Sequence, residues 1–142
     1  MIYTSYFAKL KDLEKNNIIP ISICGKAPEW YTGLQYKKVA PKWSFFKQWK
    51  ENHDNDFYIE HFNKEVLNPL RQQDVLNDLF LLLPKETQQL LSNFNCPWYT
   101  NPDIHIALIC YEKPGDFCHR HLVADWLNSY GKTINIQEFN FN

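Results

Sequence analysis

The segment Ile104–Tyr111 constrains the fold of this chain more than any other, because its residues are apolar almost without interruption. Such a run is typical of a strand that is covered on both faces at the centre of a parallel sheet. A Pro-Gly loop follows, and then apolar residues recur at helical spacing before Gly131. These helical positions are Leu122, Val123, Trp126, Leu127 and Tyr130. The pattern predicts a strand, a loop and a helix in succession.

The first residues predict a similar unit. Met1–Ser5 is compatible with a short strand, Phe7–Asn17 with a helix, and Ile18–Cys24 with a second strand that carries Pro20 near its start. Thr133–Phe141 fits a final strand. Alternating strands and helices favour an α/β fold with a mainly parallel sheet flanked by helices. With 142 residues, of which 44% are hydrophobic, we expect a single domain over residues 1–142.

The middle of the chain predicts a long loop and then several helices. Gly25–Pro41 has little periodicity and reads as a loop. Four helices are expected after it, the second with Asp54 or Asn55 as its N-cap, and a turn follows the last of them at Cys96–Trp98. These helices are Trp43–Asn52, Asp54–Asn68, Asp74–Leu83 and Lys85–Phe94.

The composition predicts a cytoplasmic protein without a membrane partner. Charged residues from Lys9 onward interrupt the N-terminal segment, unlike a signal peptide, and the longest apolar run, Leu79–Leu83, is far shorter than a membrane span. In a reducing compartment, cysteines are expected to be thiols or ligands rather than a disulfide framework. The four cysteines are Cys24, Cys96, Cys110 and Cys118.

The residues that bear chemistry gather around the Pro-Gly loop. Cys110 and Glu112 end the expected central strand, while Cys118, His119 and Arg120 begin the next helix. Ligands of open α/β sheets bind at this edge of the sheet. With Asp116 as N-cap, Cys118 would lie in the first turn, where free N–H groups favour a thiolate or a bound anion.

Two other strands are expected to end at the same edge. The first brings Thr4, Ser5 and Tyr6 there, and the second brings Ser22, Cys24 and Lys26. We therefore predict a polar pocket for a small anionic ligand or a nucleotide, held by Arg120 and Lys26. If the site is catalytic, Cys118 or Cys24 would be the nucleophile, and Glu112 or His119 would transfer protons.

A structural interpretation stands beside this hypothesis. Cysteine is often buried, so Cys110 is expected to be a core thiol. Glu112 would then pair with Arg120 or Lys113 to fix the loop. A zinc site could use Cys110, Cys118, His119 or His121, but no metal site is expected, because His119 and His121 would point to different sides of a helix and no Cys-x-x-Cys pair exists. No cofactor is expected either, since phosphate-binding glycine motifs are absent from the sequence.

A second surface is the segment Lys37–Lys50, in which five lysines alternate with Trp43, Phe45, Phe46 and Trp49. Such a segment can bind nucleic acid by charge and base stacking, so a non-catalytic nucleic-acid or protein binding module is the alternative function. The structural interpretation, which we prefer, is an amphipathic helix with packed aromatic rings and solvated lysines.

The sequence also resembles the domain-of-unknown-function family numbered 488. The resemblance lies in Thr4-Ser5-Tyr6 near the start and in Cys110, Glu112 and Cys118-His119-Arg120, where members show Cys-x-Glu followed by Cys-His-Arg. It implies an α/β fold and a shared site at the Cys-His-Arg turn, without an activity to transfer. Ser22-Ile23-Cys24 departs from the Asp-Val-Arg that many members carry there.

Overall fold

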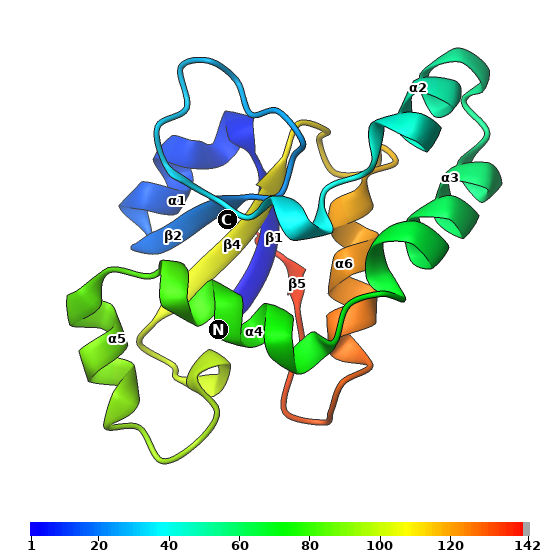
Figure 1. Ribbon diagram of the computed structural model, residues 1–142. Helices are drawn as coiled ribbons and strands as arrows, with labels where there is room; N and C mark the ends of the chain where they lie inside the picture. The colour runs from blue at the N-terminus through cyan, green and yellow to red at the C-terminus, as the bar shows by residue number, and fades with distance from the viewer. Residues whose placement is uncertain (141–142) are drawn as a thin grey trace.

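The protein is an α/β domain built on one sheet of five parallel strands. The computed structural model describes residues 1–140 and orders the strands β3-β2-β4-β1-β5, of which Figure 1 labels β2, β4, β1 and β5. The strands are β1 (Ile2–Tyr6), β2 (Ile18–Ser22), β3 (Leu34–Gln35), β4 (His105–Cys110) and β5 (Gln137–Glu138). The predicted α/β fold with a mainly parallel sheet is confirmed.

The strand β4 occupies the centre of the sheet, as the apolar run predicts. It pairs in parallel with β1 on one side, where Tyr6 lies opposite Cys110, and with β2 on the other, where Ser22 lies opposite Ile109. All of its residues from Ile106 to Cys110 are buried. Because the three strands run in the same direction, their carboxyl ends meet at one edge of the sheet.

Helices cover both faces of the sheet (Figure 1). Ile106 and Leu108 of β4 pack in a core with residues of α4 and α6, while Ala107 and Ile109 pack with Leu13 of α1 in a second core. This division follows from the alternation of side chains along a strand. The helices are α1 (Leu10–Lys15), α2 (Trp43–Asn52), α3 (Asn55–Phe62), α4 (Gln72–Leu82), α5 (Lys85–Ser92) and α6 (His119–Asn128).

The predicted helices are all present, with local differences at their ends. The first is divided into a 3-10 turn, η1 (Phe7–Lys9), and α1. Asp54 is the N-cap of α3 and accepts a hydrogen bond from the Phe57 N–H group at 3.2 Å, as expected. The helix continues as a π-helical segment, η3 (Asn63–Leu67), and a further 3-10 turn, η4 (Trp98–Thr100), begins at the last residue of the Cys-Pro-Trp sequence.

Two predictions about the sheet need correction. The segment Gly25–Pro41 is not wholly a loop, because it contains β3 and a 3-10 turn, η2 (Lys37–Val39). A two-residue strand is too short to produce an alternating pattern, and its pairing with β2 is a tertiary effect. The last strand is also shorter than expected, since β5 meets only Tyr3 and Thr4 of β1. Phe141 lies outside the described residues.

Within residues 1–140, no helix has both the length and the apolar character that a membrane crossing would need.

Candidate functional site

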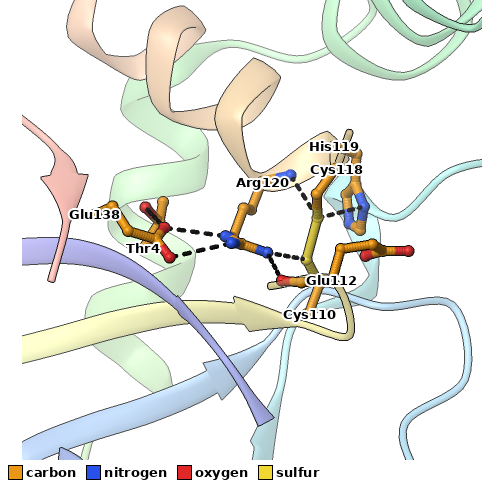
Figure 2. Close-up of polar contacts among 7 residues, drawn as sticks. All are labelled: Thr4, Cys110, Glu112, Cys118, His119, Arg120 and Glu138. Carbon is orange, nitrogen blue, oxygen red and sulfur yellow. Dashed lines mark hydrogen bonds and ion pairs between the residues drawn. A yellow bond between two sulfur atoms is a disulfide. The ribbon is translucent and has the colours of Figure 1, made fainter. Parts of the chain in front are cut away.

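The Cys-His-Arg turn lies at the carboxyl edge of the sheet, where the sequence predicts it. Cys110 is the last residue of β4, and Cys118 immediately precedes α6. Figure 2 shows the side chains of Cys110, Cys118, His119 and Arg120 gathered between this strand and this helix. Both cysteines and Arg120 are buried, so the cluster is part of the interior of the protein.

Cys110 and Cys118 are joined by a disulfide, which corrects the expectation of free thiols for these two residues. Burial of Cys110 is confirmed, but its sulfur is bonded rather than free. The disulfide forms because the loop 111–117 brings the start of α6 back to the end of β4. The spacing of the two cysteines in the sequence does not reveal this pairing. Cys24 and Cys96 are free cysteines, the first buried and the second exposed.

Cys118, and not Asp116, is the N-cap of α6. Its backbone is extended, with φ −152° and ψ 140°, and its Sγ accepts a hydrogen bond from the Arg120 N–H group at 3.5 Å. Because Cys118 lies outside the helical turn, its side chain converges with that of its neighbour: Sγ is 3.9 Å from His119 Nδ1. Adjacent residues within a helix seldom point at each other, but Cys118 and His119 can converge because Cys118 precedes the helix.

His119 is buried and is held by a backbone group of the neighbouring strand connection. Its Nε2 lies 2.8 Å from the carbonyl oxygen of Ile23 and is the donor in this contact, because a carbonyl only accepts. Burial lowers the pKa of His119 to about 4, against the opposing effect of this hydrogen bond. The imidazole is thus neutral at pH 7, with an unprotonated Nδ1 directed at the Cys118 sulfur.

Arg120 is fully buried and has protein partners on every side of its guanidinium group (Figure 2). Nε and Nη2 donate to the two carboxylate oxygens of Glu138, each at 3.0 Å. Nη1 donates to Cys110 Sγ at 3.1 Å and to the carbonyl oxygen of Glu112. Thr4 supports the pair through its hydroxyl group, which donates to Glu138 at 2.6 Å. This bidentate arrangement is among the strongest in proteins.

These contacts bear on the predicted anion pocket. Arg120 and Thr4 are engaged with Glu138, whereas the Lys26 side chain is exposed. The hydroxyl of Ser22 accepts from the Cys24 N–H group at 3.4 Å. Tyr6 lies beside the guanidinium, with its ring centre 5.7 Å from Arg120 Cζ. An anion at this edge stays a prediction, and it now depends on Lys26 more than on Arg120.

Ser5 differs from its neighbours, because its buried hydroxyl has no hydrogen-bond partner among the described residues. An unsatisfied buried hydroxyl is uncommon in folded proteins. No described contact joins it to the Cys-His-Arg turn, so its predicted ligand-binding role stays a prediction.

The two remaining candidate catalytic residues are less well suited to their predicted roles. Burial raises the pKa of the Cys24 thiol to about 12, which keeps this cysteine protonated at neutral pH and disfavours it as a nucleophile. Glu112 meets Arg120 through its backbone carbonyl rather than through a carboxylate pair. The loop is therefore joined to Arg120 by a hydrogen bond to the Glu112 carbonyl group, and not by the Glu112–Arg120 ion pair that the sequence suggests.

Glu138 is the residue of this site that sequence reasoning missed. It lies on β5, in register with Thr4, in a segment without a motif. The available signal was indirect: a buried arginine needs a carboxylate partner, and an acidic residue on a strand next to β1 would be close enough to provide it.

The segment Lys37–Lys50 largely has the structure that the amphipathic-helix interpretation predicts. Phe45 is buried in the core, and Phe46 and Trp49 pack against it, while Trp43 is exposed. Lys38 pairs with Asp78 at 3.2 Å, and Lys42, Lys47 and Lys50 are exposed. Binding of nucleic acid or protein by this surface stays a prediction.

A hollow on the surface lies away from the Cys-His-Arg turn. It measures about 720 Å³ and is lined by residues of α1, β2 and the segment Trp30–Gly33. Its wall includes none of the cysteines or Arg120. A ligand in this hollow would not meet the sulfur cluster.

The structure assembles a set of potential metal ligands that the sequence did not predict. One ligand atom each from Cys110, Cys118 and His119 lies within 4.8 Å of the others. All three residues are among the possible zinc ligands named from the sequence, where their spacing does not favour a site; the structure brings His119 together with both sulfurs.

Comparisons of the chain with protein-family models, with curated proteins and with solved structures find no match. The resemblance to the domain-of-unknown-function family numbered 488 therefore stays a prediction.

We expect Glu138→Gln to lower the free energy of unfolding by about 3 kcal/mol, because it leaves the Arg120 charge buried without a counter-charge. Urea denaturation at pH 7 measures this change. Glu51→Gln is the control, since Glu51 is an exposed glutamate in α2 and should change stability by no more than about 0.5 kcal/mol. Equal stability of the two variants would show that the pair with Arg120 is dispensable.

The low pKa of His119 predicts a loss of stability in acid. Its pKa is about 4 in the folded protein and about 6.5, the ordinary value for histidine, in the unfolded chain, so between these values the unfolded state binds more protons. Stability should fall by roughly 3 kcal/mol as the pH falls from 6.5 to 4. Denaturation curves at several pH values should have a shallower pH slope for His119→Gln than for the wild type. Identical slopes would contradict this account of the imidazole.

Proposed function

We propose that this protein performs thiol–disulfide exchange at the Cys-His-Arg turn, with Cys118 as the attacking sulfur and Cys110 as the resolving sulfur. The observation that carries this proposal is the Cys110–Cys118 bond placed beside the unprotonated Nδ1 of His119. A cysteine, a base and a group that orients the base are the parts of an activated nucleophile. The orienting group here is the Ile23 carbonyl.

The surroundings of Cys118 favour its thiolate once the disulfide is reduced. The sulfur is the N-cap of α6 and receives the Arg120 N–H group at 3.5 Å, so it lies at the positive end of the helix dipole. His119 Nδ1, 3.9 Å away, is in position to accept the thiol proton after a small rotation of the side chain. Both effects act on the same sulfur.

The surroundings of Cys110 suit a resolving and leaving group. Arg120 Nη1 donates to its sulfur at 3.1 Å, and a guanidinium group stabilises a thiolate at this distance. A more stable thiolate departs faster in an exchange reaction. The ion pair with Glu138 keeps the guanidinium in place for this contact.

The proposed reaction conserves atoms and electrons. The Cys118 thiolate attacks a substrate disulfide, forms a mixed disulfide and releases the first substrate thiolate, which takes up a proton. Cys110 then attacks the Cys118 sulfur, releases the second substrate thiol and restores the Cys110–Cys118 bond. The two electrons that reduce the substrate come from the two protein thiols, and the reverse sequence oxidises a substrate dithiol.

Access to the sulfurs requires movement of the loop 111–117. Cys110 and Cys118 are buried, whereas Lys113, Pro114, Gly115 and Asp116 of this loop are exposed. Gly115 has a φ of +92°, a conformation that other residues rarely adopt.

If the predicted cytoplasmic location holds, a disulfide at this place agrees with an exchange role, because cytosolic disulfides are usually catalytic or redox-sensing.

The test is exchange of the reduced protein with a small-molecule disulfide, in a Cys96→Ser background that removes the exposed thiol. We expect transient capture of the reagent on Cys118 and then closure of the Cys110–Cys118 bond. His119→Gln should slow capture about 100-fold if the imidazole acts as the base. Alkylation at timed intervals, followed by mass spectrometry of the peptides, measures each step.

Two controls make this experiment decisive. Cys110→Ser should accumulate the mixed disulfide on Cys118, because the resolving sulfur is gone, while Cys118→Ser should lose fast capture. Capture by the wild type that is no faster than capture by Cys118→Ser would overturn the proposal.

A further inference from the structure

We propose that the reduced form of this protein binds a thiophilic divalent cation through Cys110, Cys118 and His119, with Zn²⁺ as the ion that fits best. Thiolate and imidazole ligands together favour such ions. This inference goes beyond the exchange reaction, because it requires only that the two sulfurs be reduced and not that they react with a substrate.

The distances suit a tetrahedral ion. Around Zn²⁺, two thiolate sulfurs lie about 3.8 Å apart, and a sulfur and an imidazole nitrogen about 3.6 Å apart. Cys118 Sγ and His119 Nδ1 are already 3.9 Å apart, and all three ligand atoms lie within 4.8 Å of one another. The Cα atoms of the two cysteines are 7.6 Å apart, beyond the roughly 4.4–6.8 Å usual for disulfides. After reduction, this backbone separation leaves room for an ion between the sulfurs.

The contact behind His119 is the one that metal-binding histidines usually make. A ligating imidazole donates its other N–H group to a carbonyl or carboxylate, which fixes the tautomer and the ring orientation. His119 Nε2 has the Ile23 carbonyl as its partner at 2.8 Å, and this leaves Nδ1 as the ligand atom. The imidazole therefore needs no tautomer change to bind an ion beside the sulfurs.

The charge balance also agrees with a buried divalent ion. Two thiolates and one neutral imidazole bring Zn²⁺ to a net charge of zero, which lowers the cost of burial. The nearby Arg120 cation is already neutralised by Glu138, at 3.0 Å. Three protein ligands leave a fourth position for water or for a substrate atom, as in catalytic zinc sites.

Binding is linked to the redox state of the two cysteines. A trialkylphosphine reduces the disulfide, supplying two electrons and taking up the oxygen of one water, and the two sulfurs gain protons. Zn²⁺ then binds with release of these two protons. A small-molecule disulfide reverses the process: its two sulfurs take up the two electrons, the Cys110–Cys118 bond forms, and the ion is released.

The test measures binding of Co²⁺ and Zn²⁺ to phosphine-reduced protein, with oxidised wild-type protein as a control of the same sequence. We expect one equivalent of Co²⁺ to produce sulfur-to-cobalt charge-transfer absorption and Zn²⁺ to displace it. Cys110→Ser, Cys118→Ser and His119→Gln should each weaken binding at least tenfold. Cys96→Ser and His121→Gln should bind as the wild type does.

A second readout keeps the test valid if a variant fails to fold. In the reduced wild type, Zn²⁺ should protect Cys110 and Cys118 from alkylation and leave Cys96 reactive. Absence of the cobalt absorption and of this protection would overturn the metal site. The exchange proposal is judged separately, since a protein that binds Zn²⁺ but does not capture a disulfide would refute only the exchange, and the opposite result would refute only the metal site.

Discussion

The buried ion pair between Arg120 and Glu138 is the interaction on which the arrangement of the site depends. A guanidinium without exposure to solvent needs a counter-charge, and Glu138 supplies both oxygens at 3.0 Å. The pair connects α6 to β5, and the Thr4 hydroxyl extends it to β1. The remaining nitrogen, Nη1, reaches the end of β4 at Cys110. The Arg120–Glu138 pair thus connects the helix that begins at the Cys-His-Arg turn with three parallel strands.

The sulfur cluster follows from this framework. Parallel pairing brings the ends of β1, β2 and β4 together, and Arg120 holds the start of α6 against them. Cys118 can then cap the helix with its sulfur while His119 turns toward the connection after β2 to reach the Ile23 carbonyl. Cys110, Cys118 and His119 support two related proposals. The first is disulfide exchange by the two cysteines, and the second is cation binding when these cysteines are reduced.

Sequence reasoning succeeded where a repeating pattern carries the information. Apolar periodicity and capping chemistry predict the central strand, the Asp54 cap and, apart from β3, the order of strands and helices, and the structure confirms them. It failed where a tertiary contact decides the outcome. The partner of Arg120 lies on a two-residue strand, and the Cys110–Cys118 bond depends on how the intervening loop folds. The N-cap is Cys118 rather than the expected Asp116, because α6 begins at His119 and the Cys118 sulfur accepts the Arg120 N–H group.

The most direct test of this account is to map the cysteines of the protein after mild oxidation by a small-molecule disulfide and removal of metal ions. Denatured protein is alkylated before and after reduction, and the labelled peptides are identified by mass spectrometry. The account predicts that Cys110 and Cys118 are labelled only after reduction and are recovered as one cross-linked species. Labelling of both residues before reduction, or a cross-link that involves Cys24 or Cys96 instead, would contradict it.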